Sequence, residues 1–127
     1  MLVNPVKYYL NVSIYDVSSN PLIHCKNGGD CITIVALVGY YINDVDGLIK
    51  CNSSILCNII EGEKRSYYLD EGSRSTIEEV HLKIIYCEST TSCSNETINY
   101  GYVINGTDKT KVIECSGTSY ISIKLIT

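Results

Sequence analysis

The sequence has no Trp and no Phe, and its 127 residues include one Met, two Pro and two His. No apolar run reaches the ~18 residues of a transmembrane helix, so we expect no membrane insertion. Fourteen Asp and Glu residues outnumber ten Lys and Arg residues, which gives a net charge of −4. Nucleic acids and anionic membranes both require basic surfaces, and this charge therefore argues against either partner.

A secretory signal peptide, with a basic region before a long apolar core, is also not recognisable in this sequence. We therefore expect an excised domain or mature fragment of a secreted protein, in which Met1 is an added start residue. The length predicts a single domain, residues 1–127, that buries a sizeable core. The aromatic residues are 11 Tyr, whose polar tips suit half-exposed strand faces and interfaces.

Seven cysteines in a chain of this size are typical of an oxidising compartment, so we expect a secreted, extracellular protein. Six of them form three pairs with five residues inside each pair, and disulfides within pairs or between pairs both fit this spacing. The separations between pairs are unequal (26 residues from 25 to 51, 36 from 51 to 87), and we predict no internal repeat. The candidate disulfide cysteines are Cys25, Cys31, Cys51, Cys57, Cys87 and Cys93.

The cysteines do not have the spacing of a metal site or the setting of a nucleophile. Zinc sites use gaps of two to four residues and commonly histidine partners, so we predict no metal ligand. The seventh cysteine, Cys115, follows Val112, Ile113 and Glu114. Apolar and acidic neighbours raise a thiol pKa, and we expect Cys115 to be buried or paired outside this fragment.

Asn-x-Ser/Thr sequons agree with an extracellular location, because this pattern is the acceptor for N-glycosylation. The candidate acceptors are Asn11, Asn52, Asn95 and Asn105.

Short apolar or alternating segments separated by turn residues predict about eight to nine strands. Residues 6–17 alternate and predict a half-buried strand, whereas residues 31–42 are apolar on both faces and predict one central strand. The segment Ser75-Thr76-Ile77-Glu78 fits a capping box and predicts one helical turn. We therefore expect an all-β fold, a disulfide-supported two-sheet β-sandwich with at most one short helical turn.

The polar residues predict no catalytic centre and no cofactor site. His24 lies beside Cys25 and His81 on the polar side of an expected strand, and since neither belongs to a hydrolase signature we expect both at the surface. The acidic residues of the middle third have two interpretations, solvated turn charges or a face that attracts a basic protein. These acidic candidates are Asp44, Asp46, Glu61, Glu63, Asp70, Glu71, Glu78 and Glu79.

The segment Ser75-Thr76-Ile77-Glu78-Glu79, followed by Leu82-Lys83-Ile84-Ile85-Tyr86-Cys87, carries a resemblance to a known family. With the cysteine pairs, the sequons and the acidic charge, it resembles the secreted poxvirus immune-evasion β-sandwich proteins. That family includes viral chemokine-binding proteins and the chemokine-binding domain attached to viral tumour-necrosis-factor receptors. The resemblance covers about a sixth of the chain and implies two apposed sheets and sequestration of basic host chemokines.

Two function classes follow. The first is a secreted, non-enzymatic viral decoy that binds a host chemokine or other cytokine through acidic residues and tyrosines, which bury area at low entropic cost. The alternative is a viral or parasite surface glycoprotein domain that binds a host cell-surface immune receptor or has a structural role.

Overall fold

The computed structural model describes residues 7–11, 20–25, 30–42, 47–75, 77 and 80–124. Within them, twelve short strands form four three-stranded antiparallel sheets, and each sheet is a meander of three consecutive strands. One 3-10 turn, η1 (Glu71–Ser73), is the helical element among the described residues. The strands are β1 (Lys7–Leu10), β2 (Leu22–Cys25), β3 (Cys31–Ile34), β4 (Gly39–Ile42), β5 (Leu48–Cys51), β6 (Cys57–Ile60), β7 (Ser66–Leu69), β8 (Ile84–Cys87), β9 (Cys93–Glu96), β10 (Gly101–Ile104), β11 (Lys111–Cys115) and β12 (Tyr120–Lys124).

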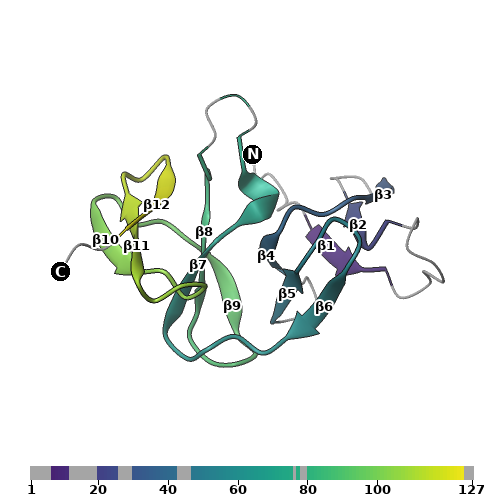
Figure 1. Ribbon diagram of the computed structural model, residues 1–127, viewed down its shortest axis with the longest axis horizontal. Helices are drawn as coiled ribbons and strands as arrows, with labels where there is room; N and C mark the ends of the chain where they lie inside the picture. The colour runs from purple at the N-terminus through teal and green to yellow at the C-terminus, as the bar shows by residue number, and fades with distance from the viewer. Residues whose placement is uncertain are drawn as a thin grey trace.

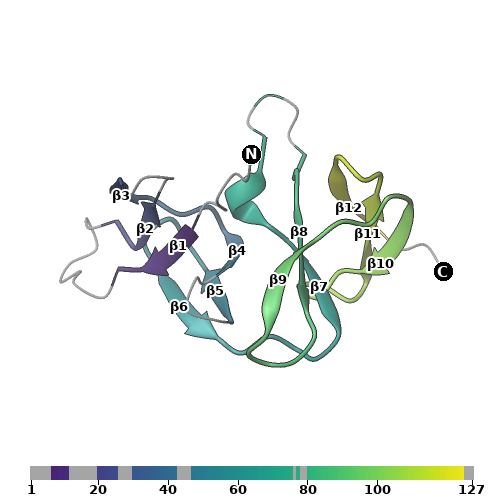
Figure 2. The same ribbon diagram turned by 180° about the vertical axis from the view of Figure 1, so that it is seen from behind.

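The four meanders lie in a row, in chain order, as both views in Figures 1 and 2 show. The all-β prediction is confirmed, but the two-sheet sandwich of eight to nine strands is wrong. Each strand is only four or five residues long and pairs with its neighbour in the chain. Because the chain leaves each sheet after its third strand, the described strands divide among four small sheets in a row instead of two sheets that face each other.

The meanders are repeats of one another, which corrects the prediction that the chain has no internal repeat. In every meander the first residue of the first strand pairs with the cysteine that ends the second strand. Each first strand, together with the residue after it, has the sequence pattern x-Tyr-(Tyr or Val)-(Leu or Ile)-(Asn or Asp). Each second strand ends with the four-residue pattern aliphatic-Ile-x-Cys, in which x is any residue. The first-strand segments are residues 7–11, 39–43, 66–70 and 101–105, and the second-strand segments are residues 22–25, 48–51, 84–87 and 112–115.

Each core cluster lies between two consecutive meanders, because neighbouring residues along a strand point to opposite faces of its sheet. In the second meander, Tyr41 and Ile49 are buried against the first meander, while Tyr40 and Leu48 are buried against the third. In the third meander, Tyr68 and Ile85 pack toward the second and Ile84 toward the fourth. The two inner sheets are therefore covered on both faces, as in repeat proteins whose units contact their neighbours.

Tyrosine pairs recur at these interfaces and account for much of the tyrosine content. The first Tyr of one meander meets the second Tyr of the next, with 4.9 Å between the ring centroids of Tyr8 and Tyr41 and 4.5 Å between those of Tyr40 and Tyr68. At the third interface the partly buried Tyr67 and Val103 pack against one cluster. Tilted ring pairs at such distances are favourable beyond the area that they bury.

The Asn or Asp after each first strand is buried wherever the structure describes it, and it closes the connection to the second strand. Its N–H donates to the carbonyl of the residue just before the repeated aliphatic–Ile pair, which satisfies a buried backbone donor. These bonds join Asn11 to Pro21 (2.8 Å), Asp70 to Lys83 (3.3 Å) and Asn105 to Lys111 (3.0 Å).

One predicted strand differs from the structure in its extent, and the predicted helical turn lies mainly outside the described residues. Residues 31–42 form two strands, β3 and β4, joined by a linker at residues 35–38. The residues of β4 are buried or partly buried, whereas in β3 only Ile34 packs against a core cluster and the other three residues are exposed. The apolar run therefore did not require one continuous, buried strand. The helical turn predicted from Ser75-Thr76-Ile77-Glu78 is not tested, and the described turn, η1, precedes it, with Asp70 as its cap because Asp70 accepts the N–H of Gly72. Thr76, Glu78 and Glu79 lie outside the described residues.

Candidate functional site

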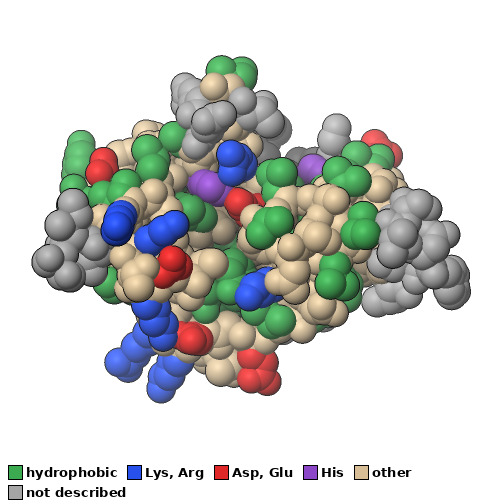
Figure 3. All heavy atoms as spheres, in the orientation of Figure 1, with side chains coloured by type: hydrophobic (Ala, Val, Ile, Leu, Met, Phe, Trp, Pro, Cys, Tyr) green, Lys and Arg blue, Asp and Glu red, His purple; other side chains and the backbone are tan. Residues whose placement is uncertain are grey.

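The acidic candidates do not share one environment. Glu61 and Glu63 are exposed in the linker between the second and third meanders, and Glu63 forms an ion pair with Lys109 at 2.7 Å. Asp70 and Glu71 lie after β7 and point into the protein. The remaining four, Asp44, Asp46, Glu78 and Glu79, lie outside the described residues. On the face in Figure 3, acidic and basic side chains are interspersed rather than gathered into one acidic area.

Asp70 is buried and its carboxylate serves the fold. One oxygen accepts the N–H of Gly72 at 3.0 Å, and the other accepts the Asn95 amide at 3.0 Å. Burial raises the pKa of Asp70 above its usual value of 3.8, against the opposing effect of these hydrogen bonds. A carboxylate held by two donors on the inside of a meander is not available to a basic partner.

His81 is buried, at 7% exposure, and the expectation of a surface histidine is wrong. Its ring bonds the carboxylate of Glu71, and both side chains are only 9% exposed. The backbone N–H of His81 donates to the Tyr120 carbonyl at 3.2 Å, and the His81 carbonyl accepts the Tyr120 N–H at 2.8 Å, which joins it to the fourth meander. The Glu71 side chain in turn passes over Gly39, where an added Cβ would lie 2.4 Å from Glu71 Cγ. The pair therefore ties three meanders together.

The hydroxyl nearest to this pair in the sequence, Ser73, is committed to the backbone. Its Oγ donates to the Asp70 carbonyl at 2.8 Å and accepts the N–H of Lys83 at 2.9 Å. An activated serine would instead hydrogen-bond a base. The arrangement of Asp70, Glu71, Ser73 and His81 is thus that of a structural polar cluster.

The cysteine pairs form three disulfides within their own hairpins, Cys25–Cys31, Cys51–Cys57 and Cys87–Cys93, each with 4.0 Å between Cα atoms. Each joins the second strand of a meander to the third, which decides between the two pairings that the spacing allowed. In the fourth meander Cys115 holds the same position and pairs in register with Tyr120. Cys115 is buried and free, and burial first and Glu114 second raise its thiol pKa, as predicted.

The sequon asparagines fall into two groups. Asn11 and Asn105 are buried at the repeated Asn/Asp position, where their amides donate to the Asn20 carbonyl and the Ser122 hydroxyl. Asn52 and Asn95 lie on exposed positions, although Asn95 also bonds Asp70. Glycan occupancy stays a prediction, and the geometry favours Asn52.

The surface that stands out is apolar and involves residues that the sequence analysis did not select. The linker between the first two meanders exposes Val35 by 61%, Leu37 by 47% and Val38 by 66%, and the disulfide loop of the second meander exposes Ile55 by 37% and Leu56 by 52%. A hydrogen bond of 3.1 Å from the Ala36 N–H to the Ser54 carbonyl joins the two segments. We call these five exposed residues the linker–loop surface.

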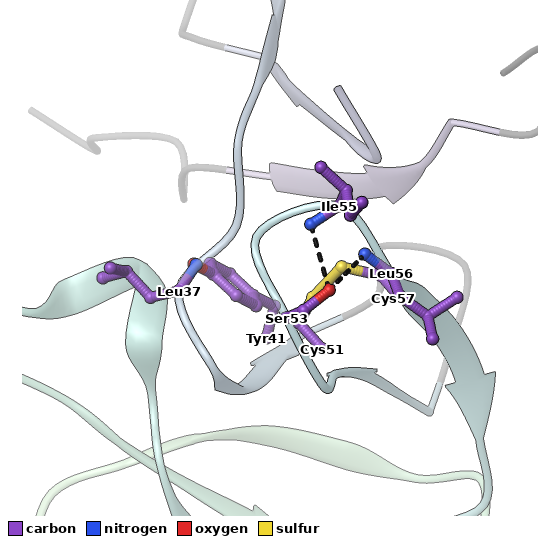
Figure 4. Close-up of a disulfide and its surroundings, with 7 residues drawn as sticks. All are labelled: Leu37, Tyr41, Cys51, Ser53, Ile55, Leu56 and Cys57. Carbon is purple, nitrogen blue, oxygen red and sulfur yellow. Dashed lines mark hydrogen bonds between the residues drawn. A yellow bond between two sulfur atoms is a disulfide. The ribbon is translucent and has the colours of Figure 1, made fainter. Parts of the chain in front are cut away.

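Hydrogen bonds hold the linker–loop surface in one shape. The Tyr41 hydroxyl accepts the N–H of Leu37 at 2.9 Å, and Ser53 Oγ accepts the N–H groups of Ile55 at 3.3 Å and Leu56 at 3.1 Å. The Cys51–Cys57 disulfide closes the base of the loop (Figure 4). Exposed aliphatic side chains on a braced loop lose little entropy when a partner covers them.

The repeat shows that this apolar character is not needed for the fold. The linker after the second meander, residues 61–65, reads Glu-Gly-Glu-Lys-Arg, and the disulfide loop of the third, residues 88–92, reads Glu-Ser-Thr-Thr-Ser. This equivalent linker and this equivalent loop are therefore polar where the same architecture forms, whereas the linker after the third meander, residues 97–100, reads Thr-Ile-Asn-Tyr. A braced group of aliphatic side chains at the surface is a mark of an interaction site.

Comparison with known proteins finds no match to this chain among family models, curated proteins or solved structures. Within the described ranges, no group of His, Cys, Asp and Glu has the arrangement of a metal site. The described residues also form no helix with the length and apolarity that crossing a membrane requires.

Proposed function

We propose that this chain is a non-enzymatic, extracellular protein-binding module and that the linker–loop surface contacts its partner. Three disulfides support an oxidising, extracellular location. The observation that carries the proposal is the braced cluster of exposed aliphatic side chains, at positions where the next linker and the next disulfide loop are polar. The buried Glu71–His81 pair and the committed Ser73 hydroxyl support a structural rather than a catalytic role for the polar cluster.

A narrower form of this proposal is a secreted viral decoy that sequesters a basic host chemokine or cytokine. It rests on the resemblance to the poxvirus family and on the net charge of −4. Among the acidic candidates that the structure describes, Asp70 and Glu71 point inward and Glu63 forms an ion pair with Lys109. Glu61 is the one that is both exposed and without an ion pair. The linker–loop surface, with its apolar contacts, is thus the better-supported contact region, and a receptor-binding glycoprotein domain uses it equally well.

The test is surface plasmon resonance against chemokines, other cytokines and immune-receptor ectodomains, at low and physiological salt. Val38→Lys and Leu56→Lys place a charge in the linker–loop surface, and Ile77→Lys is the matched control because Ile77 is 92% exposed elsewhere. We expect both surface variants to bind at least about tenfold more weakly and the control to bind as the wild type, since central interface residues dominate affinity.

Undiminished binding by both surface variants contradicts the proposed contact region. Binding to basic chemokines that weakens with salt supports the decoy, because screening reduces steering by opposite charges. If the protein binds a receptor ectodomain but none of the chemokines or cytokines, the result contradicts the decoy hypothesis and supports the glycoprotein alternative. If the protein binds no member of the panel, the result contradicts the protein-binding proposal.

A further inference from the structure

Basic side chains gather on one side of the molecule, although the net charge of the chain is −4. In Figure 3 they are most numerous at the lower left, over the β10–β12 sheet and the linker that precedes β7. Five of the ten Lys and Arg residues of the chain belong to these two segments, and all five are exposed. We call them the basic stripe: Lys64, Arg65, Lys109, Lys111 and Lys124.

Two contacts join the linker before β7 to the turn between β10 and β11. Lys109 of the turn forms the ion pair with Glu63 of the linker, at 2.7 Å. The N–H of Gly106 donates to the Tyr67 carbonyl, also at 2.7 Å. The two linker members of the stripe follow Glu63 directly in the sequence. Segments that are about 45 residues apart in the chain therefore form one basic surface.

The register of the β10–β12 sheet places two members of the stripe opposite each other. Lys111 of β11 pairs with Lys124 of β12, and cross-strand partners lie on the same face, with Cβ atoms about 5 Å apart. Like charges at such a position repel and destabilise a sheet. Among the described residues neither lysine forms an ion pair. An anion that lies across the two ammonium groups removes this repulsion.

The backbone of Arg65 is strained. Its φ is 59°, and it is the non-glycine residue with a positive φ among those that the structure describes. Glycine adopts this left-handed conformation without steric cost, whereas a residue with a Cβ does not. The Arg65 side chain is exposed, so it gives the core no packing in return. A strained backbone that displays an exposed cation is typical of a residue that makes a functional contact.

The acidic side chains of the same two segments that lie nearest to these cations already have partners. Glu63 is paired with Lys109. Asp108 accepts the N–H of Thr110 at 3.0 Å and also the Thr110 hydroxyl. The other four members of the stripe have no carboxylate partner among the described residues. They are therefore available to an external anion.

We propose that the basic stripe binds an acidic polysaccharide. The stripe extends over β12, β11, the turn before β11 and the linker before β7, so a linear polymer with repeated anionic groups reaches several of its members at once. The proposal depends on the extracellular location inferred above, where such polymers occur. Single-stranded nucleic acids need aromatic side chains on which bases stack. The stripe has none, and the exposed Tyr102 lies on the other face of the sheet from Lys111.

Surface plasmon resonance on immobilised polysaccharides tests the proposal. Polygalacturonate carries carboxylates, dextran sulfate carries sulfates, and dextran is the neutral control. We expect binding to at least one of the two acidic polymers and none to dextran. Because salt screens contacts between exposed charges, binding is expected to weaken at least about tenfold from low to physiological salt. The two acidic polymers distinguish a preference for carboxylate from one for sulfate.

Matched double variants separate the position of the charges from their number. Lys111→Gln with Lys124→Gln removes two charges from the stripe. Arg74→Gln with Lys83→Gln removes two exposed charges beside η1, where the Lys83 N–H donates to Ser73. We expect the stripe variant to bind at least about tenfold more weakly, since charge-assisted contacts are lost, and the control to bind as the wild type does. Circular dichroism establishes that both variants are folded.

Arg65→Gly separates the contact from the fold. The substitution removes the cation and relieves the positive φ, so we expect weaker binding at a urea midpoint that is equal to that of the wild type or higher. A lower midpoint shows that the side chain serves the fold and contradicts the proposal.

Three further results overturn the proposal. The first is no binding to either acidic polymer at low salt, and the second is an equal loss of binding in the two double variants. The third is tighter binding to a single-stranded oligothymidylate than to both polysaccharides. The stripe variants retain Val38 and Leu56 of the linker–loop surface, so their binding to a protein partner is expected to equal that of the wild type. The two proposals therefore fail separately.

Discussion

Tyr40 and Tyr102 occupy the same position of the repeat, yet removing them is expected to have different consequences. Each is the second residue of the first strand in its meander. Tyr40 is 7% exposed because the third meander covers it, whereas Tyr102 is 63% exposed on the face of its sheet that points away from the third meander. Replacing each with Ala therefore measures what the covering meander contributes, with local strand context nearly matched.

The magnitude follows from the buried area. A Tyr side chain buries about 200 Å² when fully covered, so the difference between 7% and 63% exposure corresponds to roughly 110 Å². At about 25 cal/mol per Å² this area is worth about 3 kcal/mol. We expect Tyr40→Ala to lower the free energy of unfolding by about 4 kcal/mol, within the range for large-to-small core changes. Tyr102→Ala is expected to lower it by about 1 kcal/mol.

The assay is urea denaturation followed by far-ultraviolet circular dichroism, at a concentration low enough that the protein is monomeric. The midpoint shift at unchanged slope gives the stability difference. Equal losses in the two variants, or a larger loss for Tyr102→Ala, refute the view that each meander is stabilised by the one that follows.

Three further changes test other parts of the structure. Asn105→Ala removes an acceptor for the Thr107 N–H and a donor to the Ser122 hydroxyl. We expect it to lower the free energy of unfolding, measured by urea denaturation, by about 2 kcal/mol. Asn52→Ala, at an exposed sequon, is expected to change the free energy of unfolding by no more than about 0.5 kcal/mol. Asp70→Asn removes a carboxyl whose pKa is raised by burial. Since the folded state binds that proton more tightly, the carboxyl reduces stability as the pH rises from 3.8 through the raised pKa. The amide also places an NH2 group against one of the two donors that Asp70 accepts, a cost that does not depend on pH. The urea midpoint of the variant relative to that of the wild type should therefore rise as the pH rises from acid to neutral, and identical pH profiles of the urea midpoint would contradict this. Cys115 is buried with a raised thiol pKa, so a thiol reagent should modify it many-fold faster in urea than in buffer, and rapid modification of the folded protein would place it at the surface.

The local signals in the sequence predicted the all-β class, although they did not predict the number of strands or the break of residues 31–42 into two strands. The segments at Leu22–Cys25 and Leu48–Cys51 form strands, and the cysteine loops behind them close as hairpins. These features depend on β-branched composition, turn residues and short cysteine spacing, which act over a few residues. The pairing of strands into sheets depends on contacts that the pattern of one segment does not contain. For that reason twelve short strands in four meanders were predicted as a two-sheet sandwich.

The repeat escaped sequence analysis because the loops differ in length while the paired positions do not. Cys25, Cys51, Cys87 and Cys115 are equivalent in register although their separations are unequal. Tyr120 also replaces the cysteine that the other three hairpins have at that position. A signal was present, since the Tyr-(Tyr or Val)-(Leu or Ile)-(Asn or Asp) segments and the aliphatic-Ile-x-Cys segments alternate through the chain.

The candidate site was predicted less well, because some charged residues of this protein are buried and some apolar residues are exposed. Asp70 and Glu71 are acidic residues beside a turn, yet the third meander turns both inward, where they bond Asn95 and His81. Val35, Leu37 and Val38 are apolar and were expected to be buried in a central strand, yet they belong to an exposed linker. Their exposure depends on where β3 ends, which no pattern of apolar residues specifies.

The measurement that tests the central claim most directly is a nuclear Overhauser spectrum of the monomeric protein with isotope-labelled Tyr. The stacked meanders place the ring of Tyr8 against Tyr41 and that of Tyr40 against Tyr68, with centroids 4.9 Å and 4.5 Å apart. Ring-to-ring cross-peaks for both pairs, with none between Tyr102 and another Tyr ring, are the predicted result. Absence of the two cross-peaks in the folded protein would contradict the neighbour-stacked repeat.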